Sequence, residues 1–261
     1  MSDQVLSYSE QDHVGVITLN RPDAMNSLNY QLYAELEDAV RESSARVLVI
    51  TGAGRAFCAG DDVKQILGGG EPAPESFRER SERSGGLTPA AEALLYTDIP
   101  VIAAVNGAAV GWGMELALMA DLRVASDRAR FGELFVVRGL CCDAPGLGRL
   151  AALVGREKAA ELLFTGEIID AATAREIGLV SRVVAAEQLM PAALQLAGRI
   201  AANPPLAVQA LKAGLRRTVE PDWRDTGRWA IEQITRLRQT EDSREGVRAF
   251  LEKRDPVYTG R

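Results

Sequence analysis

Short apolar runs alternate with stretches of helical period along the first two-thirds of the chain. Between the first two runs, Leu32, Leu36, Ala39 and Val40 recur at the spacing of one helix face. The runs themselves are short and almost continuously apolar: residues 14–19, 47–51, 101–105, 122–125 and 180–184. Buried strands that alternate with helices indicate an α/β fold.

The last part of the chain has a different pattern. From residue 192 to residue 254 the period is helical and no strand is evident, and Asn203-Pro204-Pro205 interrupts it near the start. We therefore predict a core with the active site over residues 1–200 and a helical region over residues 201–261. The glycine- and proline-rich segment 68–74 is predicted to be a mobile loop, with a plain connector as the alternative.

Composition and charge exclude several classes of function. With 261 residues, of which 47% are hydrophobic, the chain can bury a sizeable core. A net charge of -6 disfavours nucleic-acid binding, which depends on Lys and Arg at phosphates, but leaves room for a small anionic ligand. No apolar run approaches the roughly 18 residues of a membrane span, and residues 1–10 do not resemble a signal peptide. We expect no membrane partner and a cytoplasmic location.

The single histidine and the three cysteines restrict the chemistry further. His13 precedes a predicted strand, and we expect an ordinary strand-edge residue rather than the base of a Ser-His-Asp site. Cys58, Cys141 and Cys142 form neither a disulfide framework nor the ligand spacing of a zinc site. We therefore expect no metal and no redox cofactor.

Two glycine-containing loops carry the candidate chemistry. In the first, Gly60 precedes Asp61 just after a predicted strand, and glycine permits a backbone path that turns an N–H group into a pocket. In the second, a small-residue loop leads into a helix that begins near Trp112, where free N–H groups carry a partial positive charge. Two such loops that face each other would form an oxyanion hole. A phosphate-binding loop is the alternative, but neither segment matches a dinucleotide or Walker motif.

Together the two loops resemble the enoyl-CoA hydratase/isomerase (crotonase) family. The family motif Ala-Phe-Cys/Ala-Ala-Gly-x-Asp is present at residues 56–62. The motif Pro-Val-x-Ala-Ala-x-Asn-Gly, with a following Gly-x-Gly-x-Glu-Leu, is present at residues 100–116. The resemblance extends in order over nearly the whole chain, through residues 20–28, 121–125, 131–132, 174–180 and 249–256.

This resemblance implies a spiral of repeated ββα turns, followed by helices that pack subunits into a homotrimer or a hexamer. It also implies an acyl-CoA thioester as substrate, with coenzyme A as part of that substrate rather than a cofactor. The oxyanion donors would be the N–H groups of Asp61 and Trp112. Glu115 matches one of two glutamates that hold water in hydratases of the family, although a charge at a helix N-terminus is a structural alternative.

The resemblance also implies where the substrate binds. The loop from Cys58 to Val63 would offer backbone contacts to the adenine, and Phe250 and Lys253 would close over the ribose phosphate. Lys253 could equally be a solvated cation at a helix end. The full set of expected substrate contacts is Cys58, Ala59, Gly60, Val63, Gly111, Phe135, Phe250 and Lys253.

The sequence departs from the family at the second acid. Phe135 stands where the second glutamate of hydratases is expected. Glu133 is two residues out of step, but in an extended chain it would share the face of Phe135, so it is an alternative second acid. Asp143 matches the position where some isomerases and a dehalogenase of the superfamily place an aspartate, although it could instead cap a helix before Pro145. Trp112 replaces the usual glycine and should narrow the acyl pocket. Residues 144–147 replace the usual glycine pair, which leaves the conformation of that loop open.

These residues leave more than one function open. We expect hydration or double-bond isomerisation of an enoyl-CoA, with Glu115 as the main proton-transfer residue and Asp143 as the second acid. The resemblance to the family favours hydration of a 2-enoyl-CoA, whereas the absent second glutamate favours double-bond migration or another reaction that needs different acids. The alternatives are a non-catalytic acyl-CoA-binding homologue and a family member with a hydrolase, dehalogenase or C–C lyase reaction. A peptidase is remote, because the chain lacks the nucleophile of peptidases that share the spiral fold.

Overall fold

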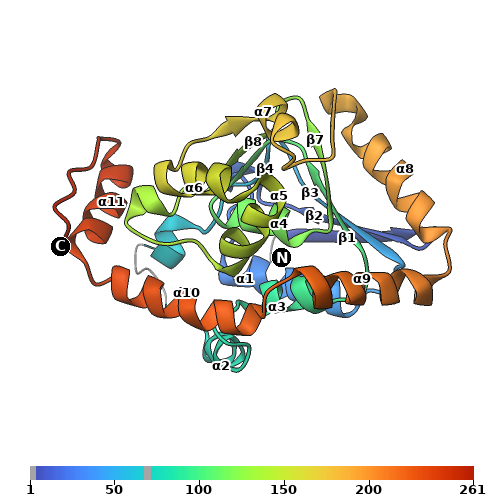
Figure 1. Cartoon of the computed structure of the whole chain (residues 1–261), viewed down its shortest axis with the longest axis horizontal. Helices are drawn as coiled ribbons and strands as arrows, with labels where there is room; N and C mark the ends of the chain where they lie inside the picture. Colours follow the sequence, from blue (N-terminus) through green and yellow to red (C-terminus); the bar gives the residue numbers. More distant parts are fainter. Residues whose placement is uncertain (1–3, 68–71) are drawn as a thin grey trace.

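The computed structural model describes residues 4–67 and 72–261. Part of the predicted loop 68–74 therefore lies outside the described residues. The strands form a six-stranded sheet in the order β1-β2-β3-β5-β7-β10 (Figure 1). Its strands are β1 Leu6–Gln11, β2 Val14–Leu19, β3 Val47–Gly52, β5 Val101–Val105, β7 Leu122–Ser126 and β10 Arg182–Val184. The pair β1 and β2 is antiparallel, and all other neighbours in this sheet are parallel.

A smaller sheet has the order β4-β6-β8-β9. Its strands are β4 Ala56–Cys58, β6 Ala108–Val110, β8 Arg130–Gly132 and β9 Ile169–Asp170. Along the chain, β3, β5 and β7 of the larger sheet are followed by β4, β6 and β8 of the smaller one. Each turn of the chain thus adds one strand to each sheet, which confirms the predicted α/β spiral.

Helices cover both faces of the larger sheet. On one face, α8 (Leu189–Ala201) packs its alanines against Val47 and Val49 of β3. On the other, Leu48 and Ile50 of the same strand join the main core. That core is bounded by α1 (Tyr30–Arg41), α3 (Pro89–Tyr96) and α4 (Trp112–Met119). Because alternate side chains of a strand point to opposite faces, burial on both faces explains the continuous apolar runs.

The helical end of the chain extends along one side of the molecule. Figure 1 shows α9 (Pro205–Val219) and α10 (Trp223–Leu237) along one long side, with α11 (Glu241–Glu252) at one end. The Lys212 ammonium ties α9 to the core, because it lies 2.8 Å from both the Asp121 carboxylate and the Ile99 carbonyl oxygen. Trp223 anchors the start of α10 and is 1% exposed. The helical character of this region agrees with the sequence pattern, and a domain boundary near residue 200 stays a prediction.

The remaining elements are short or peripheral. The α-helices are α2 Glu75–Arg83, α5 Ala151–Val154, α6 Arg156–Thr165 and α7 Ala171–Glu176. Single turns of 3-10 or π-helix are η1 Pro22–Ala24, η2 Val63–Leu67, η3 Val136–Arg138, η4 Gly146–Leu150 and η5 Ala186–Gln188. His13 stands directly before β2, where the sequence places it. It follows Asp12 in the tight turn between β1 and β2, and both residues have positive φ, 51° and 66°.

Candidate functional site

The peptide between Gly60 and Asp61 has a fixed orientation. Its carbonyl oxygen accepts a hydrogen bond from the Leu28 N–H at 2.8 Å, and the Asp62 N–H donates to the Leu28 carbonyl at 2.8 Å. In a trans peptide the N–H and C=O groups point in opposite directions. The N–H of Asp61 is therefore directed away from Leu28. No hydrogen bond within the described residues uses this N–H.

The peptide between Gly111 and Trp112 is fixed in a similar way at the start of α4. The Gly111 carbonyl accepts hydrogen bonds from the N–H groups of Met114 and Glu115, at 2.8 and 3.1 Å. The Trp112 N–H therefore points out of the helix N-terminus, where it has no partner within the helix. Among the described residues it has no hydrogen-bond partner outside the helix either.

The two loops approach each other closely. Gly60 has a φ of +88°, and a Cβ atom placed there would lie 3.2 Å from the Trp112 nitrogen and 2.9 Å from the Val110 carbonyl oxygen. Gly111 has a φ of +54°, in the region that favours glycine. Two backbone N–H groups on facing loops are the arrangement that an oxyanion hole requires. The assignment of Asp61 and Trp112 as oxyanion donors stays a prediction.

A cavity of about 340 Å³ borders both loops. Asp61, Trp112, Phe135 and Asp143 form one side of its lining. The lining from α10 and the residue that caps its C-terminal end is Ile231, Ile234, Thr235 and Arg238, and that from α2 is Phe77, Arg78, Ser81 and Glu82. The C-terminal region thus borders the cavity of its own chain through α10, whereas the sequence placed its substrate contacts at Phe250 and Lys253.

A second, narrow cavity of about 10 Å³ lies beside the first and shares Trp112 and Asp143 with it. Glu115 and Pro145 also line this space. Its volume is close to the ~10–15 Å³ needed to hold one water molecule. Glu115 and Asp143, the two candidate acids, therefore border a cavity about the size of one water molecule.

The carboxylate of Glu115 is fully buried and held by two backbone donors. One oxygen accepts the Asp143 N–H at 3.0 Å, and the other accepts the Gly146 N–H at 2.7 Å. A Cβ atom at Gly146 would lie 2.6 Å from a Glu115 oxygen, which explains the glycine. Burial raises the pKa of Glu115 well above its usual value, the charges of Glu133 and Asp143 raise it further, and the two N–H groups oppose them.

Two further carboxyl groups lie close enough to interact with Glu115. Glu133 follows β8 and is 2% exposed, and neither of its oxygens has a hydrogen-bond partner among the described residues. Burial raises the pKa of Glu133 well above its usual value, and the charge of Asp143 adds to this. Burial also raises the pKa of Asp143, to about 7, with the charge of Asp61 acting in the same direction and Arg238 opposing.

The three acids differ in their access to the cavities. Asp143 lines both of them and Glu115 lines the narrow one. Within the described residues, Glu133 lines neither. Phe135 presents its ring to the larger cavity. The structure therefore brings Glu115, Glu133 and Asp143 together. Asp143 and Glu115 border a space about the size of one water molecule, and Asp143 also borders the larger cavity.

The family model for enoyl-CoA hydratase/isomerase matches residues 9–261. The chain belongs to this family. It is 40% identical to the putative enoyl-CoA hydratase/isomerase YngF of Bacillus subtilis, over 100% of both chains. It is 39% identical to the 2,3-dehydroadipyl-CoA hydratase of Escherichia coli, over 98% of this chain and 99% of the relative. A carnitinyl-CoA hydratase structure from Mycobacterium avium matches with a TM-score of 0.87 and 37% identity, over 100% of both chains.

As a member of the enoyl-CoA hydratase/isomerase family, the chain is an enzyme that acts on acyl-CoA. In the described residues, no group of three or more His, Cys, Asp and Glu side chains could hold a metal ion. None of the helices described here is long and apolar enough to cross a membrane.

The expected coenzyme A contacts lie in two places. Cys58 is buried, and a Cβ atom at Gly113 would lie 2.0 Å from its carbonyl oxygen, so β4 packs directly on α4. The Ala59 N–H donates to the Met25 carbonyl at 3.0 Å. Val63 begins the turn η2. These contacts hold the loop from Cys58 to Val63 in place beside the larger cavity.

Phe250 and Lys253 lie elsewhere, at the end of α11. The Phe250 ring is half exposed and lies under the Arg138 guanidinium, with 4.6 Å between the Arg138 Cζ atom and the ring centroid. Lys253 ends the helix in the left-handed conformation and is exposed. Within the described residues, neither side chain lines the two cavities.

Sequence reasoning missed Tyr33 and Arg238. The Tyr33 hydroxyl donates to an Asp61 carboxylate oxygen at 2.7 Å, and both residues line the larger cavity. In the sequence, Tyr33 only follows Leu32 of the apolar helix face. Nothing else near Tyr33 indicates that it lies at the site. Arg238 caps the C-terminal end of α10, and no nearby motif indicates its position at the site.

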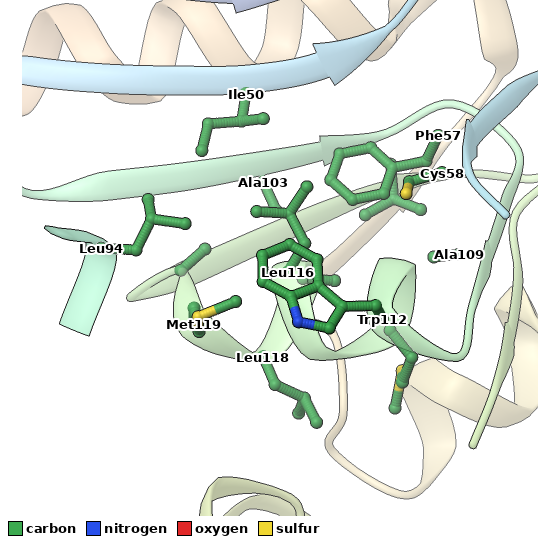
Figure 2. Close-up of a cluster of buried hydrophobic side chains, with 14 of the residues drawn as sticks. Ile50, Phe57, Cys58, Leu94, Ala103, Ala109, Trp112, Leu116, Leu118 and Met119 are labelled. Carbon is green, nitrogen blue, oxygen red and sulfur yellow. The ribbon is translucent and has the colours of Figure 1, made fainter. Parts of the chain in front are cut away.

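The indole of Trp112 has a larger structural role than the sequence suggested. Figure 2 shows it within a cluster of buried side chains that includes Phe57, Leu116 and Met119. The side chain is only 2% exposed, although it also borders both cavities. Trp112 therefore fills the core behind the pocket as well as forming part of its wall.

We predict that Gly60→Ala lowers turnover by about 100-fold, because the added Cβ must displace the Val110 carbonyl and the Trp112 nitrogen from the facing loop. Gly155→Ala is the matched control, since Gly155 also has positive φ, +79°, but a Cβ there meets nothing within 4 Å. Both variants should lose about 1 kcal/mol of unfolding free energy from backbone strain. Steady-state rates and thermal unfolding would measure the two effects, and equal activity losses in both variants would contradict the prediction.

Proposed function

We propose that this enzyme moves the double bond of an enoyl-CoA through a thioester enolate. The observation that carries the proposal is that Glu115 and Asp143 border one narrow cavity. Phe135 supports it as well, because an apolar ring stands where hydratases of the family have the second glutamate that holds water. The N–H groups of Asp61 and Trp112 would bind the enolate oxygen.

In this mechanism the two acids have different roles. Asp143, with a pKa of about 7, is ionised in a large fraction of molecules near neutral pH and would act as the base. Burial raises the pKa of Glu115 well above its usual value, which favours the protonated form, and Glu115 would act as the acid. Two carboxyl groups whose environments separate their pKa values commonly divide the acid and base roles in this way.

The proposed reaction conserves all atoms of a 3-enoyl-CoA. The base removes a proton from the α carbon, and the electron pair of that C–H bond forms the dienolate. The dienolate oxygen is stabilised by the two backbone N–H groups. Glu115 then gives a proton to the γ carbon, which leaves a 2-enoyl-CoA. A proton returns from Asp143 to Glu115 before the next turnover.

Hydration of a 2-enoyl-CoA is the second candidate. The narrow cavity has space for about one water molecule. Water held there between Glu115 and Asp143 could add to the β carbon, with the carboxyl groups moving its protons. The hydratase names of relatives and structural neighbours also support this candidate.

We further propose that the coenzyme A end of the substrate contacts both the loop from Cys58 to Val63 and the end of α11. The exposed ammonium of Lys253 suits a phosphate, and the half-exposed ring of Phe250 offers an apolar surface beside it. A cytoplasmic location remains part of the proposal. It is supported by three cysteines that are all free thiols.

A homotrimer or hexamer is proposed on the basis of an exposed apolar face. On α9, Leu211, Leu215 and Val219 follow each other at helical spacing and are 70%, 61% and 67% exposed. Trp229 of α10 is 51% exposed. Apolar side chains gathered on one helix face commonly mark a protein–protein contact.

We predict that Leu211→Glu combined with Leu215→Glu lowers the assembly state, because two carboxylates would be placed in the proposed contact. Sedimentation should give the mass of three or six chains for the wild type and a smaller mass for this variant. Leu194→Glu is the control, since Leu194 is an exposed leucine on a different helix, α8. A monomeric wild type would contradict the proposed assembly.

Glu115→Gln should reduce turnover by a factor of about 10² to 10⁴, the usual contribution of a positioned general acid or base. The glutamine keeps an oxygen that can accept one of the two backbone N–H groups, so the surrounding backbone should stay in place. Coenzyme A binding should therefore remain nearly intact. Product analysis with 2-enoyl-CoA and 3-enoyl-CoA substrates measures both candidate reactions. Wild-type rates in this variant would remove Glu115 from the mechanism.

The second acid is tested by comparing Asp143→Asn with Glu133→Gln. As a base, Asp143 must be ionised, so kcat/KM in the wild type should rise with pH through about 7. Asp143→Asn should abolish this rise and lower activity more than Glu133→Gln does. We also expect wild-type crotonyl-CoA hydration to be slow. Fast hydration that depends on Glu133 but not on Asp143 would show that Glu133 is the second acid.

A further inference from the structure

Tyr33 is the residue that contacts both proposed oxyanion-hole residues through its side chain. Its hydroxyl donates to an Asp61 carboxylate oxygen at 2.7 Å. Its ring meets the Trp112 ring edge to face, with 4.8 Å between the centroids and 82° between the planes. Tyr33 is only 3% exposed, so these contacts are made inside the protein, at the wall of the larger cavity.

Tyr33 is itself held rigidly. It lies in the first turn of α1, where the Asn29 side chain caps the helix by accepting the Leu32 N–H at 2.9 Å. The segment just before the helix pairs with the Asp61 loop through Leu28. The Phe77 ring packs edge to face on Tyr33, at 5.6 Å between centroids. A capped helix and ring packing therefore fix the hydroxyl in space.

Asp61 needs such support, because its backbone follows a glycine with positive φ. The hydrogen bond to Leu28 fixes the carbonyl end of the Gly60–Asp61 peptide. The Tyr33 hydroxyl fixes the side chain of Asp61 on the other side of that peptide. With both ends held, the Asp61 N–H has little freedom to turn away from the pocket.

The same hydrogen bond also affects the charge near the site. Asp61 carries its carboxyl group next to an N–H that would bind a negatively charged oxygen, and a free carboxylate there would oppose that charge. The Tyr33 hydroxyl draws the carboxylate towards α1 and partly neutralises it. Burial and the charge of Asp61 raise the pKa of Tyr33 well above its usual value, so the phenol keeps the proton that it donates.

We propose that Tyr33 is a positioning residue of the oxyanion hole, which holds Asp61 with its hydroxyl group and Trp112 with its ring. The inference rests on the proposed function of the Asp61 and Trp112 N–H groups. Tyr33 does not react with the substrate. It acts through the two donors, and the loss of its hydroxyl group affects the transition state more than the bound substrate.

The first test is Tyr33→Phe, which keeps both ring contacts and removes only the hydrogen bond to Asp61. We expect kcat to fall by about 10-fold with KM nearly unchanged, less than the loss of a whole oxyanion donor. Tyr8→Phe is the matched control. The Tyr8 hydroxyl also donates to a carboxylate, that of Glu10 at 2.7 Å, but on the exposed strand β1. This control should keep wild-type activity.

The second test measures the donors directly. Butyryl-CoA with a ¹³C label at the thioester carbonyl has no double bond to move, and hydrogen bonding in the oxyanion hole should lower its carbonyl stretching frequency in infrared difference spectra. Tyr33→Phe should reduce this shift, and Tyr8→Phe should not. In an Asp61→Ala background, Tyr33→Phe should have no further effect, because its partner is already gone.

Three results would overturn the inference: wild-type kcat in Tyr33→Phe, a lower kcat with an unchanged carbonyl shift, or an equal loss in the Asp61→Ala background. Failure of the proposed function gives a different result. In that case the wild type would convert neither 2-enoyl-CoA nor 3-enoyl-CoA, whatever the carbonyl shift of bound butyryl-CoA. Thermal unfolding of each variant separates a loss of folded protein from a loss of positioning.

Discussion

The close approach of two glycine-containing loops is the contact on which the site depends. The parallel pairing of β4 with β6 brings the two loops to the same edge of the smaller sheet. Gly60 and Gly113 then allow the backbones to come nearer than any side chain would permit. The position of α4 follows from this contact, and Glu115 is carried on that helix. The spiral of paired strands therefore serves to place two peptide N–H groups and one carboxyl group within a single pocket.

The burial of three acidic groups in one apolar region is the second organising feature. Glu115, Glu133 and Asp143 would repel one another if all were ionised, and burial raises the pKa of each of the three. Only Glu115 is compensated by backbone donors. A structural core would not favour such a group of acids, since buried carboxyls without partners destabilise the fold. Their presence beside a cavity is typical of a site whose chemistry moves protons.

Much of this arrangement could be predicted from the sequence, and the part that could not has a physical reason. Continuous apolar runs identified the central strands, because strands buried on both faces leave a strong local signal. Strand β1 has only one buried residue, and β9 is two residues long, so neither leaves such a signal. The two loops and Glu115 were found from motifs. Tyr33 and Arg238 were not, because their roles depend on contacts between segments far apart in the chain.

The groups that would activate the thioester belong to the main chain, and so do the donors that hold Glu115. Sheet pairing, a helix start and glycines supply these N–H groups whatever the side chains at positions 61, 112 and 143, while the contacts of Tyr33 with Asp61 and Trp112 refine the positions of two of them. In this chain the three positions hold Asp61, Trp112 and Asp143, and the backbone N–H groups are all present. In a site built in this way, substitutions can alter which acyl group fits and where a proton is delivered, while the main-chain groups that would polarise the carbonyl stay in place.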